Sequence, residues 1–227
     1  MGMKIAVDGP AGAGKSSIAK AIAHELGFVY IDTGAMYRAI GLAAVRKGID
    51  TKDQQSVISI LDQVQIELQH DQHGQQIYLD GENVSQEIRM PEISVAASNV
   101  AVIPAVRLKL VELQRILAKQ GNVIMDGRDI GTYVLPDAQI KIFLTASVEA
   151  RARRRHAELM EKGIASTLED VTIDMKYRDQ NDSGRDFAPL KPADDSILVD
   201  STDMSLQETI DKILSIVSER EKELSHN

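Results

Sequence analysis

The stretch Gly9-Pro10-Ala11-Gly12-Ala13-Gly14-Lys15-Ser16 decides the fold of this chain. A glycine, four free positions and then Gly-Lys-Ser form a loop that binds phosphates between a strand and a helix. The glycines let successive backbone N–H groups point into one concavity around the phosphate oxygens. Lys15 supplies a charge for the β and γ phosphates, and the Ser16 hydroxyl is a ligand for Mg²⁺. We therefore assign Gly9 to Ser17 to a bound nucleoside triphosphate, with Ser16 as the metal ligand.

The residues on either side of the loop have the pattern that this motif requires. Met3–Val7 precedes it as a short apolar strand. Ile18, Ile22 and Leu26 recur behind it at four-residue spacing, and Gly27 ends that helix. On ordinary composition a chance match in a chain of this length is on the order of 1%. We therefore interpret the loop as a phosphate site and not as a glycine-rich turn.

Strand-like and helix-like segments alternate along the rest of the chain. The further strand candidates are Phe28–Ile31, Val123–Met125, Ile140–Leu144 and Ile197–Val199. This pattern predicts an α/β fold of the P-loop NTPase type, with a five-stranded parallel sheet covered by helices. Aspartates come at four strand ends, the edge where such sheets bind ligands: Asp8, Asp32, Asp126 and Asp200.

One segment interrupts the alternation. Short β runs at Val64–Leu68 and Ile77–Leu79 are separated by turn residues at Asp71–Gly74, and Asp80-Gly81 forms a second turn signal. We predict a small antiparallel β insert at about residues 64–84. Its sequence leaves open whether it serves a substrate, a partner or neither.

The composition excludes several classes of protein. The net charge of −8 argues against general nucleic-acid binding, because neutralising phosphates requires a surplus of Lys and Arg. The chain has no cysteine, which excludes disulfides, thiolate zinc sites and thiol catalysis. No apolar segment suits a signal peptide or a membrane span, and no long exposed apolar stripe stands out. We expect one domain over residues 1–227, cytoplasmic and monomeric, with neither a nucleic-acid nor a membrane partner.

Polar loops with arginines follow the other strands, as a kinase with a second anionic substrate requires. A GTPase would usually carry an Asn-Lys-x-Asp motif for guanine, and the sequence has none. The loops are Asp32-Thr33-Gly34-Ala35-Met36-Tyr37-Arg38, then Asp126-Gly127-Arg128-Asp129-Ile130-Gly131-Thr132, and Arg178, Asp182 and Arg185 ahead of Phe187-Ala188-Pro189-Leu190.

Together these motifs resemble the bacterial cytidylate kinase family of nucleoside monophosphate kinases, over roughly residues 3–217. The resemblance implies transfer of the γ-phosphoryl group of ATP, with Mg²⁺, to CMP or dCMP, giving CDP or dCDP and ADP. It also implies a monophosphate-binding region at residues 33–105 and a helical lid at residues 151–185. One position departs from the family pattern, since Met90 precedes Pro91 where threonine is expected.

The resemblance assigns a role to each polar residue. Arg38 and Arg128 bind the phosphate of CMP, because planar arginine forks match phosphate oxygens. Ser98, Arg107 and Asp129 read the cytosine edge, whose amine needs an acceptor such as Asp129. The remaining residues hold the sugar, bridge to the phosphates or line the pocket: Arg178, Asp182, Arg185, Thr33 and Tyr37. The catalytic set is Lys15, Asp126, Arg128, Arg178 and Arg185.

Some of these residues have a simpler interpretation when the resemblance is set aside. Arg107 lies on an apolar-striped helix and could merely flank the core, and Ser98 is equally ambiguous. Asp126 is either an acid behind the Mg²⁺ site or a cap on the Gly127 turn, and we favour the first.

The run Arg151-Ala152-Arg153-Arg154-Arg155-His156 suits either a nucleic-acid patch or a lid. Three glutamates surround it, which disfavours the patch: Glu149, Glu158 and Glu161. On a helix, Arg151 shares a face with Arg154 or Arg155. The resemblance implies a mobile lid that carries Arg151, Arg154 and Arg155 over the triphosphate of ATP, and the sequence leaves open which of them contact it.

The implied mechanism needs no general base. A phosphate monoester with a second pKa near ~6 is largely a dianion at neutral pH, so the acceptor oxygen is already a nucleophile. Two alternatives remain: a related kinase with another monophosphate or a small metabolite as acceptor, and a nucleotide-binding regulator that transfers nothing. The base-reading set Ser98, Arg107 and Asp129 bears on the first alternative, and the acceptor-side arginines bear on the second.

Overall fold

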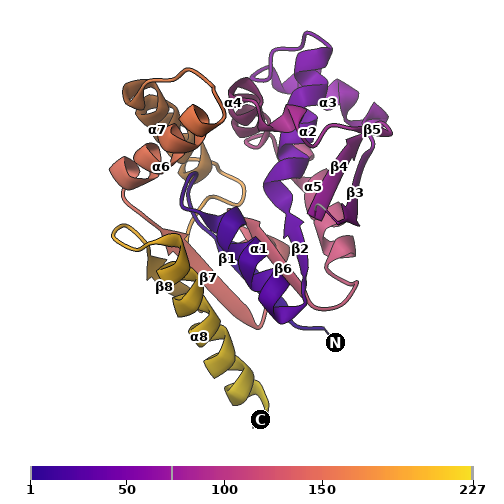
Figure 1. The fold of residues 1–227 in the computed structure, drawn as a ribbon. Coiled ribbons are helices and arrows are strands. Elements are labelled where there is room, and N and C mark those ends of the chain that lie inside the picture. Colours follow the sequence, from indigo (N-terminus) through magenta and orange to yellow (C-terminus); the bar gives the residue numbers. More distant parts are fainter. Residues whose placement is uncertain (1, 73, 226–227) are drawn as a thin grey trace.

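A five-stranded parallel sheet forms the centre of the molecule (Figure 1). The structure, a computed structural model, describes residues 2–72 and 74–225. The strands lie in the spatial order β2-β6-β1-β7-β8. Their bounds are β1 (Lys4–Asp8), β2 (Val29–Asp32), β6 (Val123–Gly127), β7 (Ile140–Thr145) and β8 (Ile197–Asp200). All five predicted strands are confirmed, each within one or two residues at either end.

Helices cover both faces of this sheet. Side chains alternate along β1, so Ile5 and Val7 pack with α1 and α8 on one face while Ala6 packs with Val111 of α5 on the other. The helices are α1 (Lys15–Leu26), α2 (Thr33–Arg46), α3 (Gln54–Ile60), α4 (Pro91–Val100), α5 (Pro104–Leu117), α6 (Val148–Glu161), α7 (Leu168–Ser183) and α8 (Leu206–Ser225). Among the described residues no single helix is long and apolar enough to span a membrane, although α4 and α5 pass that test together across a 101° bend.

The strand order places the binding site. After β1 the chain crosses to β2 on one side of the sheet, and after β6 it crosses to β7 on the other side of β1. The connections therefore diverge at the neighbouring strands β1 and β6. A crevice opens beyond the carboxyl ends of strands at such a point, so the loops after Asp8 and Gly127 face one another there.

The predicted β insert is confirmed as a separate three-stranded antiparallel sheet. It consists of β3 (Ile66–Asp71), β4 (Gly74–Leu79) and β5 (Glu82–Asn83). The second predicted turn is present, with positive φ at both Asp80 and Gly81. The first predicted turn contains residue 73, which lies outside the described residues. The apolar face of the insert packs on α2, where Ile77 and Leu79 share a core with Met36 and Ile40.

Two further helices form a unit of their own beside the sheet. Helices α6 and α7 pack on each other through a small apolar cluster that includes Leu159, Val171 and Met175. Figure 1 shows this pair opposite α4 and the insert, with the loop after β1 between them. Tyr177 of α7 donates a hydrogen bond to Asn99 of α4 at 2.7 Å, so the two sides touch.

Helix α4 begins without a side-chain cap, and this allows a test by substitution. Met90 holds the N-cap position in an extended conformation, and its side chain makes no capping hydrogen bond. We expect Met90→Thr to stabilise the protein by about 1 kcal/mol, because the threonine oxygen accepts a hydrogen bond from one of the first backbone N–H groups of the helix. For a chain of this size that raises Tm by about 2–4 °C. Thermal unfolding measures it, with Met90→Val as the control of equal shape; an equal rise in both variants would contradict the explanation.

Candidate active site

One cavity of about 690 Å³ lies at the crevice beyond β1 and β6, and its wall brings together most of the predicted site residues. The predicted residues in that wall are Ala11, Gly12, Ala13, Gly14, Lys15, Ser16, Ser17, Thr33, Tyr37, Arg38, Ser98, Arg107, Asp126, Arg128, Asp129, Arg154, Arg155, Arg178, Asp182 and Arg185. Three predicted residues do not line it: Gly9, Pro10 and Arg151.

The phosphate loop is built on positions where only glycine fits. A Cβ atom on Gly9 would lie 1.9 Å from the Leu144 carbonyl oxygen, so the loop can leave β1 only at a glycine. Gly14 adopts φ 90° where the loop enters α1. Lys15 is 6% exposed, and its Nζ donates to the Pro10 carbonyl at 2.7 Å. Ala11 to Ser17 therefore face the cavity, while Gly9 and Pro10 connect the loop to β1 and lie outside the cavity wall.

Burial and nearby charges perturb Lys15. Burial lowers the pKa of Lys15 well below its usual value, and the Arg128 guanidinium lowers it further. A bound polyphosphate would reverse both effects, because an anion beside the ammonium favours its charged form. The position is therefore suited to an anionic ligand.

Three hydrogen bonds fix Asp126 at the end of β6. The Ser16 hydroxyl donates to Asp126 Oδ2 at 2.8 Å, and the Tyr30 hydroxyl donates to Oδ1 at 2.7 Å. The Thr33 hydroxyl donates to the Asp126 carbonyl at 2.7 Å. Burial and the neighbouring Asp32 raise the pKa of Asp126. The carboxylate thus faces Ser16 instead of capping the Gly127 turn.

The donor set around Ser16 fits the magnesium ion that the motif implies. A serine hydroxyl with a carboxylate beside it provides the hard oxygen ligands that Mg²⁺ prefers, and this ion is usually bound by one or two protein groups plus phosphates. Ser16 would hold the ion, with Asp126 behind it.

Asp32 positions the arginine on the next loop. Its Oδ1 accepts from the Ala35 N–H at 2.9 Å and so caps α2. Its Oδ2 pairs with Arg38 at 2.8 Å. Burial opposes ionisation, yet Arg38 and the Ala35 N–H hold the pKa of Asp32 below its usual value. Arg38 therefore extends from the first turns of α2 in a fixed direction.

A buried ion pair forms another part of the wall. Arg107 is 1% exposed and donates from Nη2 to Asp129 at 2.5 Å. The Arg107 guanidinium also bonds the Ala101 carbonyl and lies over the Tyr37 ring at 5.4 Å. Arg107 therefore belongs to the cavity and does not merely flank the core. Ser98 lies close by, where its hydroxyl accepts a hydrogen bond from Asn181 at 3.2 Å.

Two arginines contact a single carboxylate, that of Asp182, and the charge of a third, Arg178, lies close enough to help lower the pKa of Asp182. Arg128 Nε donates to Asp182 at 2.6 Å, and Arg185 lies 3.6 Å from the other oxygen. Burial, with Arg128 nearby, lowers the pKa of Arg178 to about 10. Within the described part of the chain, Nε and Nη2 of Arg185 are buried without a hydrogen-bond partner. This surplus of confined positive charge calls for an anion.

The three lid arginines differ from one another. Arg151 is buried beneath the phosphate loop, where it donates to the Ala11 carbonyl at 3.0 Å and forms a two-point ion pair with Asp179. The prediction that Arg151 faces the triphosphate is therefore not matched by its position. Arg151 lies on the face of α6 that packs on the phosphate loop, and the spacing of the arginines does not reveal which face that is.

Arg154 and Arg155 do line the cavity, in different ways. Arg154 donates to the backbone carbonyls of Ser201 and Met204 and braces the loop before α8. Arg155 pairs with Glu158 at 2.8 Å on the same helix. Arg155 thus pairs with a carboxylate in the cavity wall, whereas Arg154 also donates to the Ser201 hydroxyl at 3.3 Å.

The strand-end aspartates divide into two groups. Asp32 and Asp126 line the cavity, as expected. Asp8 instead lies behind it and accepts from the Ile130 and Gly131 N–H groups at 2.8 and 2.7 Å. Burial raises the pKa of Asp8 to about 7 despite these two bonds. Asp200 is exposed and bonds Thr202, away from the cavity.

Several polar side chains at the site were not assigned from the sequence, among them Arg89 and Tyr30. Arg89, in the short helical turn Glu87–Arg89 after the insert, lines the cavity, and its charge helps lower the pKa of Asp32. Tyr30 orients Asp126 from within β2. Arg89 carries no motif, but a tyrosine two residues before a strand-end aspartate alternates onto the same side of the strand, and that spacing could have indicated Tyr30.

Comparison with known proteins identifies the family. The family model described as cytidylate kinase matches residues 5–219. The cytidylate kinase of Geobacillus sp. (strain WCH70) is 51% identical over 218 residues, which cover 96% of this chain and 97% of that protein. The cytidylate kinase of Caldicellulosiruptor bescii is 50% identical over 214 residues, covering 94% and 95%.

A solved structure agrees on the fold. A gluconokinase from Sinorhizobium meliloti 1021 matches with a TM-score of 0.51 over 99% of this chain and 96% of that one, at 16% identity. That likeness confirms the P-loop kinase architecture alone, while the sequence matches cover almost the whole chain at about half identity. The chain belongs to the cytidylate kinase family.

Proposed function

We propose that this chain transfers the γ-phosphoryl group of ATP to CMP or dCMP by direct in-line attack of the acceptor phosphate. The observation that supports this most is the pairing of two cationic groups in one cavity. Lys15 and the phosphate loop form one group, and Arg38, Arg128, Arg178 and Arg185 form the other. An enzyme that joins two anions must overcome their repulsion, and opposed cations do so.

The donor occupies the loop side of the cavity. The triphosphate lies along Ala11 to Ser17, where backbone N–H groups and the start of α1 face it. The cavity continues past Arg154 to Met204, Leu206 and Thr209, which leaves room for the donor's sugar and base. Ser16 would hold Mg²⁺, which supplies charge to the phosphates when it is bound.

The acceptor occupies the opposite side. Arg38 and Arg128 bind its phosphate, and Asp182 with Arg178 and Arg185 holds the sugar or bridges to the phosphates. Asp129 accepts from the cytosine amine, and Arg107, fixed by that same carboxylate, donates to the ring's acceptors. Ser98 contributes a hydroxyl at the same edge.

No side chain acts as a general base in this mechanism. The acceptor oxygen belongs to a phosphate that has already lost its proton at neutral pH, because its second pKa is near ~6. The residues orient two phosphates in line and neutralise the charge of the transferring group. Regulators that only bind nucleotides have no need of the acceptor-side arginines.

Residues 151–185 act as the lid, and residues 33–105 as the monophosphate-binding region, within a single kinase domain that works as a monomer. Helices α6 and α7 have their own small core, so they can move as a unit. Closure would bring Arg155 from Glu158 to the triphosphate and would exclude water, which otherwise competes as acceptor.

Release of ADP in the presence of different acceptors tests this function. The purified protein with ATP and Mg²⁺ should release ADP rapidly with CMP and dCMP, more slowly with UMP, and not with AMP or a small hydroxyl acceptor. The same assay without acceptor measures background hydrolysis. Absence of ADP release with every acceptor would contradict the proposal and favour a nucleotide-binding regulator.

A further inference from the structure

The outer edge of β2 carries backbone groups that the main sheet does not use. β2 is an edge strand, paired on one side with β6. Along an edge strand alternate residues point their N–H and C=O groups away from the sheet, where they need other partners. On β2 these residues are Tyr30 and Asp32, the same two that orient Asp126 and Arg38.

Two side chains of the β insert bind these backbone groups. Gln75 Oε1 accepts from the Asp32 N–H at 2.8 Å, and Gln75 Nε2 lies 3.5 Å from the Asp32 carbonyl. His70 Nε2 lies 2.8 Å from the Tyr30 carbonyl. A carbonyl oxygen can only accept, so the proton of His70 is on Nε2 in this contact.

The two residues form a cross-strand pair within the insert. His70 and Gln75 lie directly opposite each other in the β3–β4 register. They stand on the face that also carries Leu68 and Ile77, which packs towards the α2 core. The backbone of β2 explains why two polar residues end this otherwise apolar face of the insert, since His70 and Gln75 form hydrogen bonds with it.

We propose that Gln75, supported by His70, is a positioning residue for the acceptor phosphate: it fixes the backbone of Asp32, and Asp32 in turn directs Arg38. Three contacts fix Asp32: its N–H donates to Gln75, its Oδ1 caps α2 and its Oδ2 pairs with Arg38. Through these two residues the insert supports the acceptor side, although neither of them touches the nucleotide itself. This inference rests on the proposed function, because it assumes that Arg38 binds the acceptor phosphate.

Gln75→Ala tests the inference in steady-state kinetics. The KM for CMP should rise about fivefold, the equivalent of about one ordinary hydrogen bond, while kcat and the KM for ATP change less than about twofold. Gln76→Ala is the matched control: it is the next residue on β4, of the same type, and it bonds Asp71 and Asn83 on the other face. That control should leave all three constants unchanged.

The same substitution in a protein that already lacks Arg38 separates a positioning role of Gln75 from a general effect on the structure. In an Arg38→Ala protein, Gln75→Ala should raise the KM for CMP less than about twofold further, because residues acting through one contact are not additive. A full fivefold effect in that background, an equal effect on the KM for ATP, or no effect of Gln75→Ala at all would each overturn the inference. If the unmodified protein did not phosphorylate CMP, the proposed function would fail instead, which keeps the two failures distinct.

Discussion

Replacing Lys15 by alanine is expected to lower kcat about a thousandfold, which is the scale of losing a preorganised electrostatic donor at the transferring group. Lys15 is 6% exposed and is the cation of the phosphate loop, so water cannot replace its charge at the β and γ phosphates. In the proposed arrangement Arg128 and Arg178 bind the acceptor and cannot take over the role of Lys15. Release of ADP with saturating ATP and CMP measures the effect.

The same substitution should leave the fold intact. The hydrogen bond of Lys15 goes to the Pro10 carbonyl, and its burial beside Arg128 already disfavours the charged form. Removing that charge relieves repulsion, so Tm should change by less than about 3 °C. Lys47→Ala, at the exposed end of α2, is the control and should keep full activity. Near wild-type turnover in Lys15→Ala would refute the assignment of the loop.

The fold could be predicted because its signals are local. The phosphate loop, the apolar runs of the five strands and the spacing of Ile18 and Ile22 each depend on neighbouring residues alone. The β insert was predicted for the same reason, from two short β runs and the Asp80-Gly81 turn. Strand ends were the least accurate, since β3 and β4 both extend further towards the turn than the apolar residues do.

The site could be predicted less completely because it depends on which faces meet. Arg151 and Arg155 belong to one basic run, yet one is buried under the phosphate loop and the other faces the cavity. Nothing in the spacing of that run says which face of α6 packs on the loop. Gln75 and His70 are likewise ordinary polar residues until the insert is seen against the edge of β2.

Charge on the acceptor side is balanced by carboxylates that also fix geometry. Asp32 directs Arg38, Asp182 directs Arg128, and Asp129 directs Arg107. Each arginine can therefore meet its ligand without first losing side-chain freedom, which reduces the entropic cost of binding. Removing one of these carboxylates would leave its arginine as an uncompensated cation, and the effect should be largest for the most buried pair.

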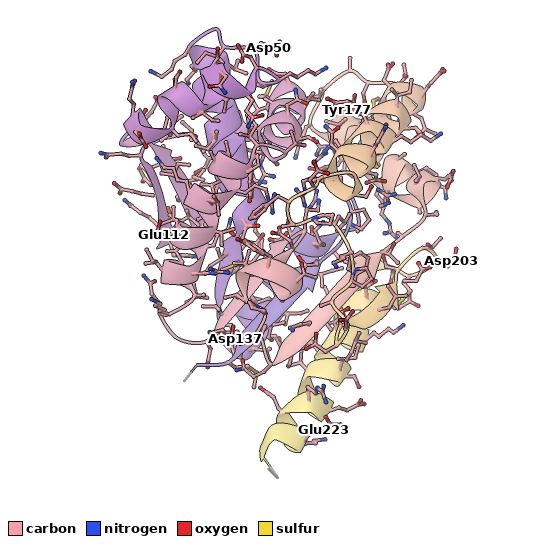
Figure 2. The ribbon with its side chains drawn as sticks, turned by 180° about the vertical axis from the view of Figure 1, so that it is seen from behind. Asp50, Glu112, Asp137, Tyr177, Asp203 and Glu223 are labelled. Atoms are coloured by element: carbon pink, nitrogen blue, oxygen red, sulfur yellow. The ribbon has the colours of Figure 1, made fainter. Side chains whose placement is uncertain are left out.

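Asp129 belongs to that most buried pair, so Asp129→Ala should affect both stability and CMP use. Arg107 would keep a buried charge without its carboxylate, which costs about 3 kcal/mol and lowers Tm by about 6–12 °C. Asp137→Ala is the matched control: its carboxylate pairs with Lys4 at the surface, so its loss should cost less than about 1 kcal/mol. Figure 2 shows Asp137 at the opposite end of the molecule from Tyr177 and Asp50.

The kinetic effect of Asp129→Ala should fall on one substrate. The KM for CMP is expected to rise about a hundredfold, because the cytosine amine loses its acceptor and Arg107 loses the group that holds it in place. The KM for ATP should stay within about twofold, since the phosphate loop and Met204 lie on the donor side of the cavity. Measurements at 15 °C, well below the lowered Tm, separate recognition from unfolding. Equal losses for CMP and ATP would show that Asp129 supports the whole site and does not read the base.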